Sequence, residues 1–168
     1  SGSWVKETVT VGGTPEVGGI SPSIAVDSNG KVHISHQASN KVRYVTNMGG
    51  GWISEIALST GNFGNTSALA VDPNIKIHIV GNSSSPSGLY YGTNQSGSWT
   101  EELVESGSNA GFFPSIFVKT NSTIVIASDN SGPKVAIGGS NSWTSTRVDS
   151  GFSDATSVAV DSQGFIHV

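Results

Sequence analysis

The chain has 168 residues, a formal net charge of −4, and charged side chains at only 12% of its positions. Its eight lysines and arginines are scattered, which argues against binding to nucleic acid or to an anionic membrane, since both need clustered basic side chains. Without cysteine it can form neither a disulfide nor a cysteine-based metal site. No apolar run approaches the ~18 residues of a membrane-spanning helix, so we expect no membrane span.

The chain opens with one strand-like segment and then repeats itself. Segment 1–10 contains the alternating run WVKETV, which predicts a single strand. Further short runs rich in Val and Ile are separated by Gly, Ser, Asn and Pro, and together they predict an all-β fold in one domain. Repeats of about 45 residues follow the opening strand. They cover 21–58, 66–105 and 113–149, with a partial repeat at 155–168.

Each full repeat contains four short strands, which we call a, b, c and d. In the first repeat they are SIAVD, KVHIS, KVRYVTN and WISEIAL. The turn between a and b, DSNG at 27–30, is tight, because Gly and Asn accept the positive φ of a hairpin. Neighbouring strands can therefore pair as antiparallel meanders, in the order d, abcd three times, and ab. A tryptophan begins every strand d, at Trp4, Trp52, Trp99 and Trp143.

Strand a is apolar on both faces, as Ile24, Ala25 and Val26 illustrate. A single meander of this length cannot cover both faces of its own strand. Stacking meanders face to face around an axis, with strand a innermost, does cover them. The sequence therefore predicts a β-propeller of about four blades, or part of a larger one. A parallel β-helix is the alternative, but its successive strands are not joined by tight hairpins.

The repeat core PSIAVDSNGKVHIS, with KVRYVTN and GGWISE, resembles the sialidase-type propeller repeats, also called Asp-box or BNR-like repeats, over residues 1–168. The Asp box is only approximated, because 46–52 and 93–99 keep the Gly and Trp but contain no Asp. The resemblance implies the fold of secreted propellers rather than sialidase chemistry. A sialidase also needs an arginine cluster to hold a carboxylate, and this chain has only Arg43 and Arg147, on different repeats. We therefore expect no enzymatic activity, no cofactor and no metal.

The strand order leaves the last repeat with strands a and b but no strand c. Further blades beyond Val168 would complete it, and so would a strand d, 4–10, from a neighbouring subunit. Exchange between subunits gives a ring if it closes and a filament if it does not. Because unpaired strand edges promote association, we expect this chain to self-associate.

Asp in strand a and His in strand b recur together. The third repeat has Lys119 and Val125 at these two places, so both residues are lost in the same repeat. This joint loss predicts that each Asp bonds its own His, with a structural role favoured over a repeated metal or sugar site. The predicted pairs are Asp27 with His33, Asp72 with His78, and Asp161 with His167.

Loops between b and c, and between d and the next a, combine small polar residues with phenylalanines. This mixture suits a saccharide, whose C–H groups stack on aromatic rings and whose hydroxyls bind amides. The alternative for each phenylalanine is packing between neighbouring blades. The candidate ligand-binding residues are His36, Gln37, Asn40, Asn62, Phe63, Asn82, Asn109, Phe112, Asp129, Asn130 and Phe152.

Strand d of the second repeat carries Glu101, Glu102 and Glu105. Paired carboxylates serve glycosidases. On an outermost strand, however, we expect an exposed charged edge that discourages aggregation. Asn-x-Ser/Thr triplets give N-glycosylation acceptors at Asn65, Asn82, Asn94 and Asn121.

The abundance of Ser, Thr and Asn with little charge is typical of proteins outside cells, so we expect a secreted or cell-surface protein. We expect a non-catalytic, lectin-like propeller that binds glycans. One alternative is a structural subunit of a fibre or surface assembly built by strand exchange. A third is the propeller scaffold of a glycosidase whose active residues lie elsewhere.

Overall fold

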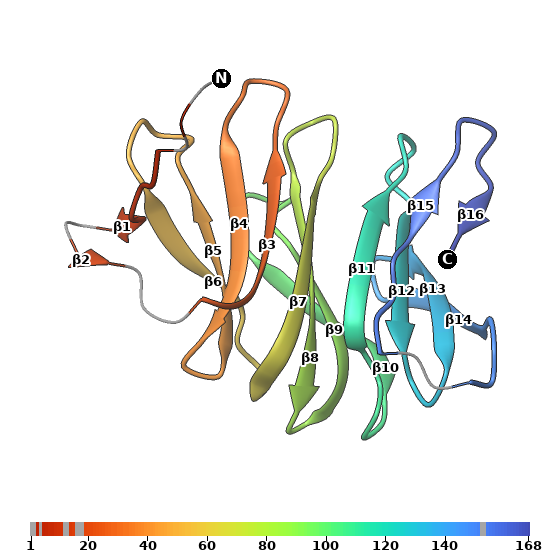
Figure 1. Cartoon of the computed structure of the whole chain (residues 1–168). Coiled ribbons are helices and arrows are strands. Elements are labelled where there is room, and N and C mark those ends of the chain that lie inside the picture. Colours follow the sequence, from red (N-terminus) through yellow and green to blue (C-terminus); the bar gives the residue numbers. More distant parts are fainter. Residues whose placement is uncertain (1–2, 4, 12–13, 16–18, 152–153) are drawn as a thin grey trace.

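The computed structural model describes residues 3, 5–11, 14–15, 19–151 and 154–168, and every regular element in this part of the chain is a β-strand (Figure 1). Three four-stranded antiparallel sheets follow one another along the chain and stand side by side. The strands of each sheet pair in chain order, as a meander does. The predicted all-β class is confirmed, and we call the three sheets the first, second and third blade. The described residues contain no helix that could span a membrane.

The inner strands of the three blades lie next to one another (Figure 1). The first blade comprises β3 (Ile20–Val26), β4 (Val32–Ala38), β5 (Lys41–Thr46) and β6 (Ile53–Leu58). The second comprises β7 (Phe63–Val71), β8 (Ile77–Ser84), β9 (Ser87–Thr93) and β10 (Thr100–Ser106). The third comprises β11 (Phe112–Val118), β12 (Ile124–Asp129), β13 (Pro133–Gly139) and β14 (Ser142–Arg147).

A two-stranded sheet flanks the blades at each end. β15 (Ala159–Val160) and β16 (Ile166–His167) pair as strands a and b of a fourth, open blade beside the third. At the other end β1 (Thr10–Val11) pairs with β2 (Thr14–Pro15). The predicted strand over 1–10 differs from this, because residues 5–9 join no ladder. Trp4, which was expected to begin that strand, lies outside the described residues.

The apolar core lies between the blades. Side chains alternate along a strand, so each sheet turns one row of side chains toward each neighbour. Val42 and Tyr44 of the first blade form one apolar cluster with Leu69 and Ile79 of the second. A second cluster joins the second and third blades. Its buried members are Val80, Leu89, Tyr91, Ile124, Ile126 and Ala136. Each blade therefore covers a face that its neighbour cannot cover alone.

A tryptophan of each blade contacts the segment that precedes that blade in the chain. The ring of Trp99, next to β10, lies 5.4 Å from the ring of Tyr44 in the first blade. Its Nε1–H donates to Glu55 Oε2 of the first blade at 2.6 Å. Trp52 repeats this bond, donating to Glu7 Oε1 at 2.8 Å. These bonds fix where the outer strand of one blade lies relative to the blade before it.

At the third blade the pattern is incomplete. The ring of Trp143 lies 5.3 Å from that of Tyr91 in the second blade, so the stacking is kept. The indole N–H of Trp143 is buried without a hydrogen-bond partner. Glu102, which corresponds to Glu55, also has a buried carboxylate oxygen without a partner.

Replacing Trp99 and Trp143 by phenylalanine separates the stacking from the hydrogen bond. Both changes remove comparable ring area, but only Trp99→Phe removes an indole N–H that donates to a carboxylate. We expect Trp99→Phe to lower the free energy of unfolding by about 1–2 kcal/mol more than Trp143→Phe. Urea denaturation of the two variants measures the difference. Equal losses of unfolding free energy in the two variants would mean that the hydrogen bond to Glu55 adds no stability beyond that of ring stacking.

Candidate functional site

The structure brings the predicted Asp27–His33 pair together and adds a tyrosine to it. His33 Nε2 lies 3.2 Å from Asp27 Oδ2, and His33 Nδ1 lies 2.6 Å from the Tyr44 hydroxyl. The other carboxylate oxygen, Asp27 Oδ1, accepts the backbone N–H groups of Asn29 and Lys31. One aspartate thus closes the turn between β3 and β4 and also orients the histidine.

The second blade repeats this arrangement less tightly. His78 Nδ1 lies 2.6 Å from the Tyr91 hydroxyl. His78 Nε2 lies 3.7 Å from Asp72 Oδ2, within ion-pair reach but too far for a hydrogen bond. Both His33 and His78 are 0% exposed, so no ligand can reach either ring. These groups therefore hold the blade together from within.

The third blade lacks all three groups. Lys119 and Val125 replace Asp and His, as the sequence analysis noted, and Val135 stands at the strand position of the tyrosine. The role of the tyrosine was not predicted from the sequence, although the tyrosine is absent from the same repeat that lacks the Asp and the His. In the open fourth blade His167 Nε2 lies 3.1 Å from Asp161 Oδ2, but these side chains are 63% and 37% exposed.

The charge state of the buried groups follows from their surroundings. Burial lowers the pKa of His78, although Asp72 acts in the opposite direction, so this imidazole is neutral at pH 7. Burial raises the pKa of Tyr91 to about 12, and its hydroxyl keeps its proton. A protonated hydroxyl donates to Nδ1, which leaves the imidazole proton on Nε2, facing the carboxylate.

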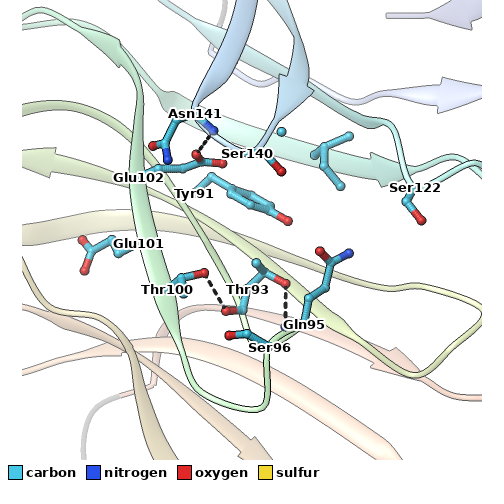
Figure 2. Close-up of a pocket in the computed structure, with 12 residues that line it drawn as sticks. Tyr91, Thr93, Gln95, Ser96, Thr100, Glu101, Glu102, Ser122, Ser140 and Asn141 are labelled. Atoms are coloured by element: carbon cyan, nitrogen blue, oxygen red, sulfur yellow. Dashed lines mark hydrogen bonds between the residues drawn. The ribbon is translucent and has the colours of Figure 1, made fainter.

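The candidate binding site is a cleft of about 460 Å³ between the second and third blades (Figure 2). It lies beside the turns from β9 to β10 and from β13 to β14. Figure 2 shows Gln95, Ser96 and Ser122 around it, with Glu102 and Asn141 at one side. Most of the lining residues carry a hydroxyl, amide or carboxylate group. No Lys, Arg or His belongs to it among the described residues.

The short outer turn of the third blade leaves room for this cleft. The connection between the two outer strands covers 47–52 in the first blade and 94–99 in the second, but only 140–141 in the third. Ser140 and Asn141 have φ of 53° and 63°, which suits a two-residue hairpin. Both residues of this turn line the cleft, so the turn forms part of its wall.

The same turn changes the environment of Glu102. The backbone N–H of Asn141 donates to Glu102 Oε2 (Figure 2). Glu102 Oε1 has no hydrogen-bond partner in the described chain, whereas Glu55 at the equivalent place is bound to Trp99. The indole N–H of Trp143 is also without a partner among the described residues, so the bond that joins Trp99 to Glu55 is not made between Trp143 and Glu102.

The acidic residues of β10 are not the exposed edge that the sequence suggested. Glu101 accepts the backbone N–H groups of Ser59 and Thr60, which belong to the connection after the first blade. Adjacent residues on a strand point to opposite faces, which is why Glu101 and Glu102 reach different neighbouring blades. Two carboxylates facing apart cannot flank one glycosidic bond.

Glu105 also ties the second blade to the third. It accepts hydrogen bonds from Lys134 and Asn130, and from the Ser145 hydroxyl at 2.8 Å. Burial alone would raise the pKa of Glu105, but these hydrogen bonds outweigh burial and lower it. The three carboxylates of β10 therefore serve contacts between blades.

Many of the predicted ligand residues are instead buried between the blades. Gln37 Nε2–H donates to the backbone carbonyl of Phe63, at the start of β7, and Asn82 Nδ2–H donates to that of Ala110, in the connection before β11. Phe63 is 1% exposed and belongs to the apolar cluster that also contains Val42 and Leu58 of the first blade, which is the predicted alternative of packing between blades. His36 and Asp129 are buried as well.

The remaining predicted ligand residues are scattered. Asn40, Asn62 and Asn109 are exposed on loops at the edge opposite the cleft, and Phe112 is half-buried. Asn130 holds Glu105. Phe152 lies outside the described residues. No group of three or more His, Asp or Glu side chains in the described ranges could hold a metal ion.

The four N-glycosylation acceptors differ in accessibility. Asn82 is buried, and its amide is bound to Ala110, so a glycan there would conflict with this packing. Asn94 Oδ1 accepts the N–H of Ile77 and is half-buried. Asn121 is exposed on the turn before β12. Asn65 lies in β7, and its side chain lies outside what the structure describes.

No family model matches the sequence, and no curated protein sequence matches it. Solved structures of virginiamycin B lyase from Staphylococcus aureus resemble the fold. The selenomethionine form has a TM-score of 0.65 at 14% identity, covering 89% of this chain and 47% of that chain. A catalytically inactive form with quinupristin has a TM-score of 0.67 at 13% identity, covering 95% and 51%. The fold is a β-propeller.

This propeller chain spans about half the length of those lyase structures. At such low identity the likeness concerns the fold alone. A fucose lectin from Kordia zhangzhouensis, in complex with methyl-fucoside, has a TM-score of 0.47 at 13% identity over 74% of this chain and 96% of that chain. That overlap is too loose to support an argument about function.

The lowered pKa of His78 predicts how the stability of the fold depends on pH. A histidine whose pKa is lower in the folded state gains a proton more readily on unfolding, so folding loses stability as pH falls below about 6.5. Asp27 and Asp161, whose pKa values are also lowered, change the pH dependence of stability only near pH 4. We expect the urea concentration at the midpoint of unfolding to decrease when the pH is lowered from 7 to 5. This decrease should be smaller in His78→Val.

Valine is the residue found at the equivalent position of the third blade, so this change fits the strand. His167→Val in the open blade is the matched control and should keep the pH dependence of the natural chain. The same pH slope in His78→Val and in the natural chain would show that the His78 imidazole is not the responsible group.

Proposed function

We propose that this propeller is a non-catalytic module that binds a neutral saccharide in the cleft between its second and third blades. The observation that carries the proposal is the cleft itself, most of whose lining residues carry a hydroxyl, amide or carboxylate group, Glu102 among them. Sugar hydroxyls can donate to the Glu102 carboxylate, and side chains such as Gln95 and Asn141 can bind further hydroxyls.

The charges of the cleft favour a neutral ligand. Glu102 repels an anion, and the described lining offers no basic side chain to compensate. A sialoside or a phosphorylated sugar is therefore disfavoured. The lining also offers no histidine to serve as a base, and Glu101 faces away from Glu102. This supports a binding role rather than a hydrolytic one.

The proposal places the protein outside the cell or on its surface, where neutral glycans are exposed. The low proportion of charged residues and the abundance of Ser, Thr and Asn agree with this placement. Single clefts of this kind give weak binding, and several copies on one assembly would add avidity.

An array of neutral and sialylated glycans, followed by calorimetry on the best ligand, tests the proposal. We expect Glu102→Gln to weaken binding of the neutral ligand about tenfold, since a charge-assisted hydrogen bond is replaced by a neutral one. Glu55→Gln is the matched control, because Glu55 occupies the same place in its blade but is bound to Trp99. It should leave the affinity unchanged.

A second pair of variants tests the location. Gln95→Ala changes an exposed side chain of the cleft, and Asn62→Ala changes an exposed amide at the opposite edge. We expect only Gln95→Ala to weaken binding. Loss in Asn62→Ala alone would move the site to the loops that the sequence suggested. Absence of any saccharide ligand would refute the proposed function.

A further inference from the structure

The turn between the first two strands has the same backbone geometry in all four blades. In each turn the N–H of the fourth residue donates to the carbonyl of the first residue. The fourth residue has a positive φ in every case, between 61° and 90°. These pairs are Gly30 with Asp27, Ile75 with Asp72, Ser122 with Lys119, and Gly164 with Asp161.

Only the turn of the first blade places an asparagine before a glycine. Its third and fourth residues are Asn29 and Gly30, and no other asparagine of the chain is followed by glycine. The other three blades have Asn74–Ile75, Asn121–Ser122 and Gln163–Gly164 at these positions. One turn geometry therefore occurs with and without this dipeptide in a single chain.

An asparagine that precedes a glycine can react with its own backbone. The amide nitrogen of the glycine, once deprotonated, is a nucleophile for the carbonyl carbon of the asparagine side chain. Glycine favours this attack because it has no Cβ to obstruct the approach and because its backbone rotates freely. A stiff β-branched residue, such as Ile75 after Asn74, hinders the attack.

The surroundings of Asn29 leave its side chain available. Asn29 is exposed, and its side-chain amide makes no hydrogen bond to the described residues. A Cβ built on Gly30 would meet no atom within 4 Å, so the space beside the nucleophilic nitrogen is open. Asn74 and Asn121 are also exposed, although their blades have a neighbour on either side. The exposure of Asn29 is therefore a property of the turn and does not arise from its place near one end of the chain.

We propose that Asn29 is a site of spontaneous deamidation in the folded protein, with water as the only co-reactant. The deprotonated nitrogen of Gly30 attacks Cγ of Asn29. The bond from Cγ to Nδ2 breaks, and Nδ2 leaves as ammonia after taking up a proton in place of the one that Gly30 lost. Water then opens the succinimide ring and returns a proton to the Gly30 nitrogen. Addition at Cγ gives aspartate, whereas addition at the backbone carbonyl carbon gives isoaspartate, and no group is oxidised or reduced.

The reaction places a new negative charge beside Asp27. Asp27 Oδ1 accepts the N–H groups of Asn29 and Lys31 at 2.8 and 2.9 Å, and Asp27 Oδ2 lies 3.2 Å from His33 Nε2. A carboxylate at position 29 repels that of Asp27. An isoaspartate also lengthens the main chain inside the turn and displaces the N–H groups that Asp27 accepts. Deamidation therefore weakens the link from this turn to His33, and this inference does not depend on the saccharide site.

Peptide mapping by mass spectrometry, after incubation of the folded chain in alkaline buffer, tests the proposal. We expect Asn29 to lose its amide and to take up oxygen from isotopically labelled water, while Asn74 and Asn121 keep their amides. The loss should be slower in mildly acidic buffer, because less of the Gly30 nitrogen is deprotonated there.

Three variants use residues that the chain already places in this turn. Asn29→Gln introduces the residue of the fourth blade and should prevent the loss. Gly30→Ser introduces the residue of the third blade and should slow the loss to that of Asn121. Ile75→Gly brings the reactive dipeptide to the second blade and should make Asn74 lose its amide. Because each replacement occurs naturally in an equivalent turn, all three variants should fold.

Two outcomes would overturn the proposal. Asn29 that keeps its amide in the folded chain, but loses it in urea, would show that the hydrogen bond from Gly30 to Asp27 protects the turn. Equal loss at Asn29, Asn74 and Asn121 would show that the glycine is not the cause.

Asn29→Asp tests the effect of the new charge by itself. We expect this variant to unfold at a lower urea concentration than the natural chain. Asn121→Asp is the matched control, because Lys119 stands there in the place of Asp27, and it should not lower the midpoint. An unchanged midpoint in Asn29→Asp would overturn the inferred effect on Asp27.

Discussion

The contact between each tryptophan and the blade before it is the interaction on which the structure depends. A four-stranded meander leaves apolar side chains on both faces, and only a neighbour can cover them. Trp99 covers Tyr44 and binds Glu55, so one residue provides apolar area and also fixes the position of the outer strand. Stability in such an array is shared between blades and their contacts, which is why the ends, where a contact is missing, carry the most exposed apolar side chains.

Inside the blades a second, polar arrangement supports the first. Asp27 closes a turn, orients His33, and through it holds the Tyr44 hydroxyl, whose ring packs against Trp99. A turn, a strand pairing and a contact between blades are thereby linked. The third blade has Val125 and Val135 in place of the histidine and the tyrosine, and both belong to one apolar cluster, so an apolar interior can take the place of the polar one. It compensates through Glu105, which binds Lys134, Asn130 and Ser145 across the boundary.

The fold could be predicted well from the sequence because the same strand and turn pattern occurs in several repeats, so each repeat supports the interpretation of the others. Tryptophan spacing and recurrent turns located the strands of the blades, and the joint loss of Asp and His pointed to their pairing. The site was predicted poorly. Gln37, Asn82 and Phe63 looked like loop ligands, but a polar or aromatic residue at a blade edge serves equally to bind the next blade. The cleft depends on a difference between repeats, the short turn at 140–141, and a search for similarity overlooks such differences.

That short turn has a consequence for how this surface can diversify. The cleft owes its shape to the length of a surface hairpin, while the buried residues beneath it belong to the architecture. Exchanging only the segment between β13 and β14 would alter the walls and depth of the recess and leave strand register and interior packing untouched. The shape of one wall of the recess thus depends on a surface turn, whereas strand register depends on the strands beneath it.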